Sequence, residues 1–266
     1  MLILLRKAAG RISRAAGALL GRPPVLPPSN DDVDMEPAFN AIWDVCRPFT
    51  MTSKARGYGL FKAAEHLVRA GITGDLVECG VWRGGSTMVM AMSMLHFGDA
   101  SRTIHLFDTF DGMTRPGDLD RSAISGAPVL GRWEAARRPD GGNDWGRADQ
   151  EDVRTNLGLT HYPADQFRFY VGDVARTLPA AVLGNIAILR LDTDFYDSTK
   201  IEMETLYPKV VPGGFLILDD YGHFTGARRA VDEYFGAAAV PPFLHRLDYT
   251  GRLIQIPGEP VAPSGT

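Results

Sequence analysis

The sequence predicts an α/β protein with a seven-stranded, mostly parallel sheet flanked by helices. Five apolar runs of strand length are separated by segments long enough for a helix, at residues 75–80, 103–108, 167–173, 186–192 and 214–220. Such alternation is typical of parallel strands joined by right-handed crossovers. Two further runs, 242–249 and 252–257, meet across Thr250 and Gly251 and predict an antiparallel pair that closes the sheet.

The composition is that of an ordinary globular protein. The 266 residues are 45% hydrophobic and 23% charged, which suits one domain whose core needs no disulfide. The two cysteines, Cys46 and Cys79, are far apart and lack metal-ligand spacing, so we expect a reduced, cytoplasmic setting. The net charge of −4 argues against nucleic acid as a partner.

Residues 1–30 differ from the rest of the chain. Residues 1–22 carry five basic side chains and no acid, and a proline-rich linker follows them. Their apolar runs are too short to span a bilayer. Two interpretations stay open: a helix packed on the domain, or a basic amphipathic helix making peripheral contact with an anionic membrane surface. We expect the domain itself to span 31–258, with a short tail at 259–266.

Glycines follow the first predicted strand, which comes after a helix expected at about 54–70. In ECGVWRGGST (78–87), Gly80, Gly84 and Gly85 allow a sharp turn and a close approach to a ligand. The loop has neither the GxGxxG pattern nor the GK[ST] ending of a phosphate loop. The neighbouring Glu78 would favour a cationic group on that ligand, and the alternative is a purely structural turn.

Carboxylates end the second and third predicted strands. Asp108 has the spacing from the glycine loop that suits a carboxylate accepting from ribose hydroxyls, and its alternative role is a helix cap or turn residue. Asp173 could accept from an adenine amino group, or be a turn residue.

The stretch 111–150, between the second and third predicted strands, interrupts the alternation of strands and helices. Because long loops in compact domains are often functional, we predict that this stretch forms a lid over the site.

The acids after the last two parallel strands form the sharpest pattern. Asp192 follows one strand, and Asp219 and Asp220 follow the next. Since parallel strands end at one edge of a sheet, the three carboxylates predict an all-oxygen site suited to Mg²⁺. Alternatively, Asp194 or Asp197 caps the next helix and the acidic pair is solvated. His223 could act as a base or be a turn residue.

Several of these motifs together resemble the macrocin/mycinamicin O-methyltransferase family. The resemblance covers about residues 50–256 and is carried by GDLVECGVWRGGST, HLFDTFDGM, VGDVARTLP, LRLDTDFYDSTKIEMETLYPKVVPGGFLILDDYG and GARRAVDEYF. It implies a Rossmann-like class I methyltransferase fold, S-adenosylmethionine and Mg²⁺. It implies metal ligation by Asp192, Asp219 and Asp220, with Asp192 also as the base. The cofactor contacts that it implies are Met51, Thr52, Glu78, Gly80, Gly84, Ser86, Asp108 and Asp173.

The residues and the resemblance predict Mg²⁺-assisted methyl transfer to a sugar hydroxyl of a glycosylated natural product. Either Asp192 or His223 would take the proton. One alternative acceptor is a sugar of a cell-envelope glycolipid or polysaccharide, which the basic N-terminus favours. Another alternative is a non-catalytic partner protein that binds S-adenosylmethionine, and the complete set of acids argues against it. The resemblance also implies self-association into a homo-oligomer.

Overall fold

The computed structural model describes residues 35–236, 238 and 240–258. The predicted N-terminal segment, its possible membrane helix and the tail at 259–266 therefore lie outside the described residues. Across the described part of the chain, no helix combines the length and apolar character needed to cross a membrane.

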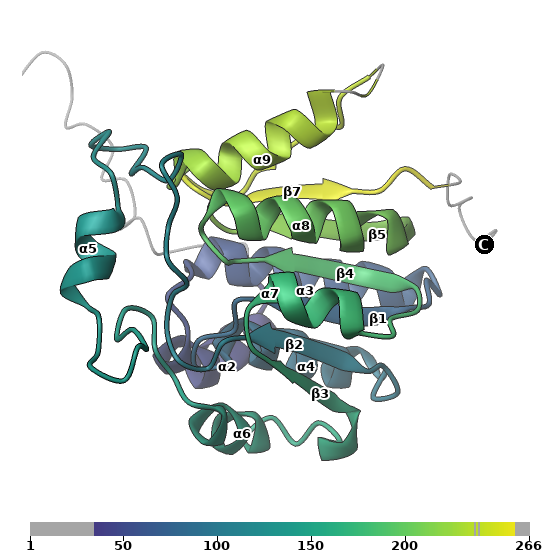
Figure 1. Ribbon diagram of the computed structural model, residues 1–266. Coiled ribbons are helices and arrows are strands. Elements are labelled where there is room, and N and C mark those ends of the chain that lie inside the picture. Colours follow the sequence, from purple (N-terminus) through teal and green to yellow (C-terminus); the bar gives the residue numbers. More distant parts are fainter. Residues whose placement is uncertain (1–34, 237, 239, 259–266) are drawn as a thin grey trace, which may run out of the picture. The chain divides into compact units, whose positions relative to one another are not determined.

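Within these residues, seven strands form one sheet in the order β3-β2-β1-β4-β5-β7-β6. The first five are parallel, and β7 pairs antiparallel with both β5 and β6. The predicted sheet is thus confirmed (Figure 1). The strands are β1 (Asp75–Cys79), β2 (Ile104–Asp108), β3 (Phe167–Val171), β4 (Ile186–Leu191), β5 (Val210–Leu218), β6 (His245–Arg246) and β7 (Arg252–Gln255).

Helices cover both faces of the sheet. In Figure 1, α7 and α8 lie in front of the sheet, and α2, α3 and α4 lie behind it. The α-helices are α2 (Pro37–Cys46), α3 (Lys54–Arg69), α4 (Gly85–Phe97), α5 (Leu130–Ala135), α6 (Gln150–Gly158), α7 (Val174–Thr177), α8 (Tyr196–Leu206) and α9 (Thr225–Gly236). Short 3₁₀ turns lie at Arg47–Phe49, Ala164–Gln166, Leu178–Ala180 and Tyr207–Lys209.

The glycine loop packs directly against the end of β4. Gly80 has φ +81°, and a Cβ there would lie 1.9 Å from the carbonyl oxygen of Asp192. Only glycine fits this position, because an L side chain would face both the unfavourable φ and the clash. The loop following β1 is therefore held beside the acids following β4.

The stretch 111–150 folds beside one end of the sheet, with α5 as its helix (Figure 1). Its Met113 and Trp145 pack against a buried cluster of Val129, Phe195, Phe224 and Ala227. Phe195 immediately precedes α8, and Phe224 immediately precedes α9. Aromatic contacts thus attach this stretch to the segments that follow β4 and β5. Its role as a lid stays a prediction.

Candidate active site

Two adjoining cavities open at the carboxyl ends of the parallel strands. We call the larger one, of about 890 Å³, the main cleft; Met51, Thr52, Arg132, Trp145 and His223 are among its lining residues. The smaller one, of about 400 Å³, is the side cavity, and it reaches Gly172 and Asp173 after β3. Both are lined by Gly80, Asp108, Gly112, Met113 and Asp192. Asp192 therefore lies at their junction.

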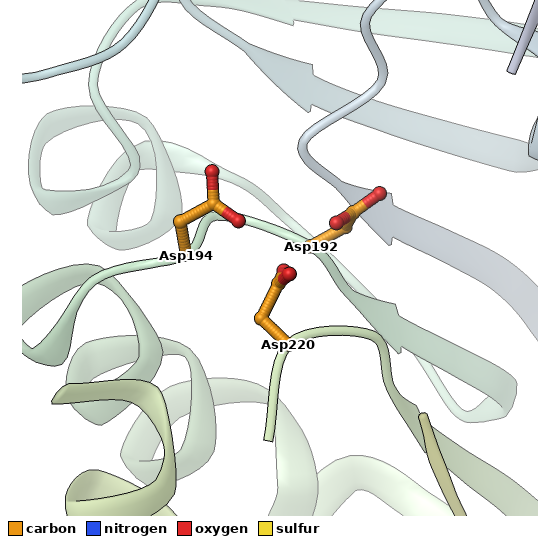
Figure 2. A group of neighbouring side chains, drawn as sticks. All are labelled: Asp192, Asp194 and Asp220. Carbon is orange, nitrogen blue, oxygen red and sulfur yellow. The ribbon is translucent and has the colours of Figure 1, made fainter. Parts of the chain in front are cut away.

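Three carboxyl groups gather on the wall of the main cleft. Asp192 and Asp194 follow β4, Asp220 follows β5, and each offers an oxygen within 4.8 Å of the others. Figure 2 shows these side chains around a common space between the two strand ends. Burial and the neighbouring carboxylates raise the pKa of Asp220, and burial raises that of Asp194. One oxygen of Asp220 is buried without a hydrogen-bond partner.

The side chain of Asp219 does not join this cluster of three carboxyl groups. Its side chain contacts the guanidinium groups of Arg190 and Arg56 and accepts from the hydroxyl of Thr52 at 3.2 Å. It is only 4% exposed, and its two oxygens are occupied by these donors. The structure therefore brings two of the three predicted metal ligands together and adds Asp194 in place of Asp219. The N-cap position of α8 is occupied by Phe195, so Asp194 does not have its alternative role as the cap of that helix.

Arg190 holds the buried charges together. It lies inside β4 and is 1% exposed. One guanidinium nitrogen, Nη1, is 2.7 Å from Glu78 Oε1 and 2.7 Å from Asp192 Oδ2, and Nη2 contacts Asp219. This single cation links β1 to the ends of β4 and β5, and it orients the Asp192 carboxylate.

Glu78 lies beneath the glycine loop and lines neither cavity. It is 1% exposed, accepts from the hydroxyl of Thr87 and pairs with Arg190. Burial raises its pKa to about 7, although Arg190 opposes the shift. In the described structure Glu78 therefore stabilises the loop region through its buried contacts with Thr87 and Arg190.

Asp108 fixes the same loop from the side. Its carboxylate accepts from the backbone N–H groups of Val81 at 2.6 Å, Trp82 at 3.1 Å and Phe110 at 2.7 Å. Asp173 caps α7 by accepting from the Ala175 N–H at 2.9 Å. Both acids therefore play the turn or cap role that was the alternative interpretation, and both also line the side cavity.

Of the remaining predicted residues, Met51 and His223 line the main cleft, whereas Ser86 lines neither cavity. Met51 is 66% exposed at the edge of the cleft. Ser86 is buried, and its hydroxyl is 3.4 Å from that of Thr50. His223 lines the cleft, with Nδ1 3.1 Å from the hydroxyl of Tyr249. Burial, and then the charges of Arg132 and Arg56, lower the pKa of His223.

The sequence interpretation missed Arg190 and Arg56, and it gave Asp194 only a possible role as a helix cap. A signal for Arg190 existed, because a lone arginine interrupts the apolar run IAILRLD. A fully buried charge needs a partner, so such a residue points to a buried ion pair. Arg56 gave no comparable signal, since basic residues are common on amphipathic helices. Its carboxylate partners, Asp219 and Asp248, are distant in the sequence.

Comparisons with known proteins agree on one family. The family described as Macrocin-O-methyltransferase (TylF) matches residues 43–255. The chain is 36% identical over 202 residues to the 8-demethyl-8-(2,3-dimethoxy-alpha-L-rhamnosyl)-tetracenomycin-C 4'-O-methyltransferase of Streptomyces olivaceus, covering 76% of this chain and 73% of the relative. It is 33% identical, with the same coverage, to the Demethyldecarbamoylnovobiocin O-methyltransferase of Streptomyces niveus.

A solved structure leads to the same conclusion. The O-methyltransferase NovP is 31% identical and matches with a TM-score of 0.67, covering 79% of this chain and 82% of that chain. The predicted enzyme class is thereby confirmed, and it supports S-adenosylmethionine as the methyl donor. The chain belongs to the macrocin O-methyltransferase family.

Proposed function

We propose that this enzyme methylates a sugar hydroxyl of a glycosylated natural product with the help of Mg²⁺. The observation that carries the proposal is the position of Asp192, which lies at the junction of two cavities and beside Asp194 and Asp220. The names of two relatives support the acceptor class, since one acts on a rhamnosylated tetracenomycin and the other on demethyldecarbamoylnovobiocin.

The side cavity and the glycine loop suit S-adenosylmethionine, which supplies an electrophilic methyl group when bound. Asp108 and Asp173 line this side, where the carboxyl ends of parallel strands bind nucleotide-like ligands. Gly80 lines both cavities, so the loop backbone itself faces the space that the donor would occupy. Met51 and Thr52 line the main cleft.

The three clustered acids fit a divalent cation. Carboxylate oxygens are the ligands that Mg²⁺ prefers. Arg190 pairs with Asp192 of this cluster, and a bound cation would offset the remaining repulsion among the three carboxyl groups. The partnerless buried oxygen of Asp220 is a further reason to place the cation here. When bound, Mg²⁺ would lower the pKa of the acceptor hydroxyl. Asp192, Asp194 and Asp220 would hold it.

The side chains around the junction can move the hydroxyl proton. Arg190 orients Asp192, so the carboxylate keeps a fixed direction toward the junction. The lowered pKa of His223 keeps its imidazole neutral near pH 7 and able to accept a proton. In the reaction the sugar oxygen–methyl bond forms, the sulfur–methyl bond breaks, and the proton passes to Asp192 or His223. S-adenosylhomocysteine is the second product.

The test is turnover of glycosides by the purified full-length chain. The acceptors are the rhamnosylated tetracenomycin and demethyldecarbamoylnovobiocin, and the S-adenosylhomocysteine formed is measured by mass spectrometry. We expect activity that EDTA removes and Mg²⁺ restores. Asp192→Asn should lower kcat by about 100-fold or more, whereas Asp197→Asn, an exposed acid on α8, should not. Full activity of Asp192→Asn, or activity insensitive to EDTA, would contradict the proposal.

A further inference from the structure

The main cleft contains an arginine, Arg132, that forms no ion pair with any acid in the described part of the chain. Arg132, on α5, lines the cleft together with Asp194, Asp220 and His223. No carboxylate of the described residues lies within ion-pair distance of its guanidinium, whereas Arg190 and Arg56 in the same region are paired with acids. A guanidinium has five N–H donors and no acceptor, so Arg132 retains hydrogen-bonding capacity toward the cleft.

Trp145 supports this guanidinium. The Cζ atom of Arg132 lies 4.1 Å from the centre of the Trp145 ring, which is a close cation–π contact. The Trp145 ring restrains the guanidinium, and no ion-pair partner among the described residues occupies its N–H groups. A stacked arginine loses less side-chain freedom on binding a ligand than a mobile one, because its orientation is already restricted.

Trp145 packs against the two segments that carry Asp194 and His223. Its ring meets Phe195 edge-on, with centroids 5.8 Å apart, and Phe224 with centroids 6.4 Å apart. Phe195 directly follows Asp194, and Phe224 directly follows His223. The Arg132–Trp145 pair is therefore held at a fixed position relative to the groups that surround the reacting hydroxyl.

We propose that the Arg132–Trp145 pair recognises the acceptor, with Arg132 donating hydrogen bonds to oxygens of the sugar that neighbour the methylated hydroxyl. The planar donor fork suits two adjacent oxygens, such as vicinal hydroxyl or ether groups on one ring. The pair lines the main cleft beside Asp194, Asp220 and His223 and does not line the side cavity, where Asp108 and Asp173 would bind the donor, so we assign its contacts to the acceptor. This inference rests on the proposed function.

The same stretch of chain provides a matched control. Arg137 lies over the ring of Trp133 at 5.7 Å, so it is also an exposed arginine stacked on a tryptophan. Neither Arg137 nor Trp133 lines either cavity. Loss of Arg137 thus repeats the local effect of removing a stacked arginine without touching the cleft.

The experiment compares steady-state kinetics of Arg132→Ala, Arg132→Lys and Arg137→Ala with those of the wild-type chain, using the two glycosides named above. Loss of a charged hydrogen-bond donor should raise the acceptor KM of Arg132→Ala about 10- to 100-fold, with kcat and the S-adenosylmethionine KM nearly unchanged. The acceptor KM of Arg132→Lys should lie between those of the wild type and Arg132→Ala, because lysine keeps the charge but lacks the planar pair of donors. Arg137→Ala should match the wild type.

Two results would overturn this inference while leaving the proposed function intact: an acceptor KM for Arg132→Ala within twofold of the wild type, or a rise in KM that Arg137→Ala reproduces. A loss of S-adenosylmethionine binding by Arg132→Ala, measured by calorimetry, would assign the arginine to the donor side and overturn it as well. A wild-type chain that methylates neither glycoside would instead overturn the proposed function, and this inference with it.

Discussion

Replacing Arg190 by methionine tests the buried charge network most directly. Arg190 is the cation shared by Glu78, Asp192 and Asp219, and methionine fills similar space without charge. Asp219 would keep Arg56 as a partner, and Asp192 is partly exposed to the cleft. Glu78 would keep only the Thr87 hydroxyl. The loss of folding free energy should therefore arise mainly from Glu78, whose buried charge would be left without a cationic partner.

Removing one partner of a buried ion pair typically costs about 3–5 kcal/mol, because a buried charge is left uncompensated. The total stability of a domain is only about 5–15 kcal/mol. We therefore expect Arg190→Met to lose about 3–5 kcal/mol at pH 8. The exposed Arg69, which pairs with Glu65 one helical turn away, provides the control. Arg69→Met should lose less than about 0.5 kcal/mol.

The loss should depend on pH. The pKa of Glu78 is raised from 4.5 to about 7 on folding, so the folded chain binds this proton more tightly than the unfolded chain. The contribution of Glu78 to stability therefore falls as pH rises from about 4.5 to 7. Without Arg190 its pKa rises further, and the decline continues above pH 7. The difference between variant and wild type is thus larger at pH 8 than at pH 6.

Urea unfolding at pH 6, 7 and 8 measures these differences. In the double variant Arg190→Met/Glu78→Gln, neutralising the stranded acid should restore part of the lost stability at pH 8. If Arg190→Met were as stable as the wild type, or equally destabilised at every pH, our assignment of Arg190 as the counter-ion of Glu78 would be wrong.

Two further predictions concern the candidate active site. Asp194→Asn should weaken Mg²⁺ binding by roughly tenfold or more, as measured by titration calorimetry, because it removes one carboxylate of the cluster; unchanged affinity would exclude Asp194 as a ligand. If His223 takes the proton, kcat of the wild type should fall as pH drops through its lowered pKa, below 6.5, and His223→Gln should lack that acidic limb. An identical pH profile in both would leave Asp192 as the base.

The sequence alone determined the architecture and the edge at which the site lies. Five apolar runs followed by acids or glycines are enough to predict parallel strands, since the period and length of such runs reflect burial on both faces. Parallel strands end at one edge, which places the acids after β4 and β5 near each other and near the glycine loop. The two closing runs likewise predicted the antiparallel pair β6 and β7.

Only the tertiary structure decided which acids face one another. Asp219 and Asp220 are adjacent in the bend after β5, yet Asp219 contacts Arg56 and Arg190 whereas Asp220 lies beside Asp192 and Asp194. Asp194 lies beside Asp192 in the short connection between β4 and α8, where its backbone adopts the left-handed region with φ +69°. The partners of Arg190 come from three strands, and the ring that supports Arg132 is carried by a loop. Such contacts depend on how distant segments pack, which no local pattern of residues encodes.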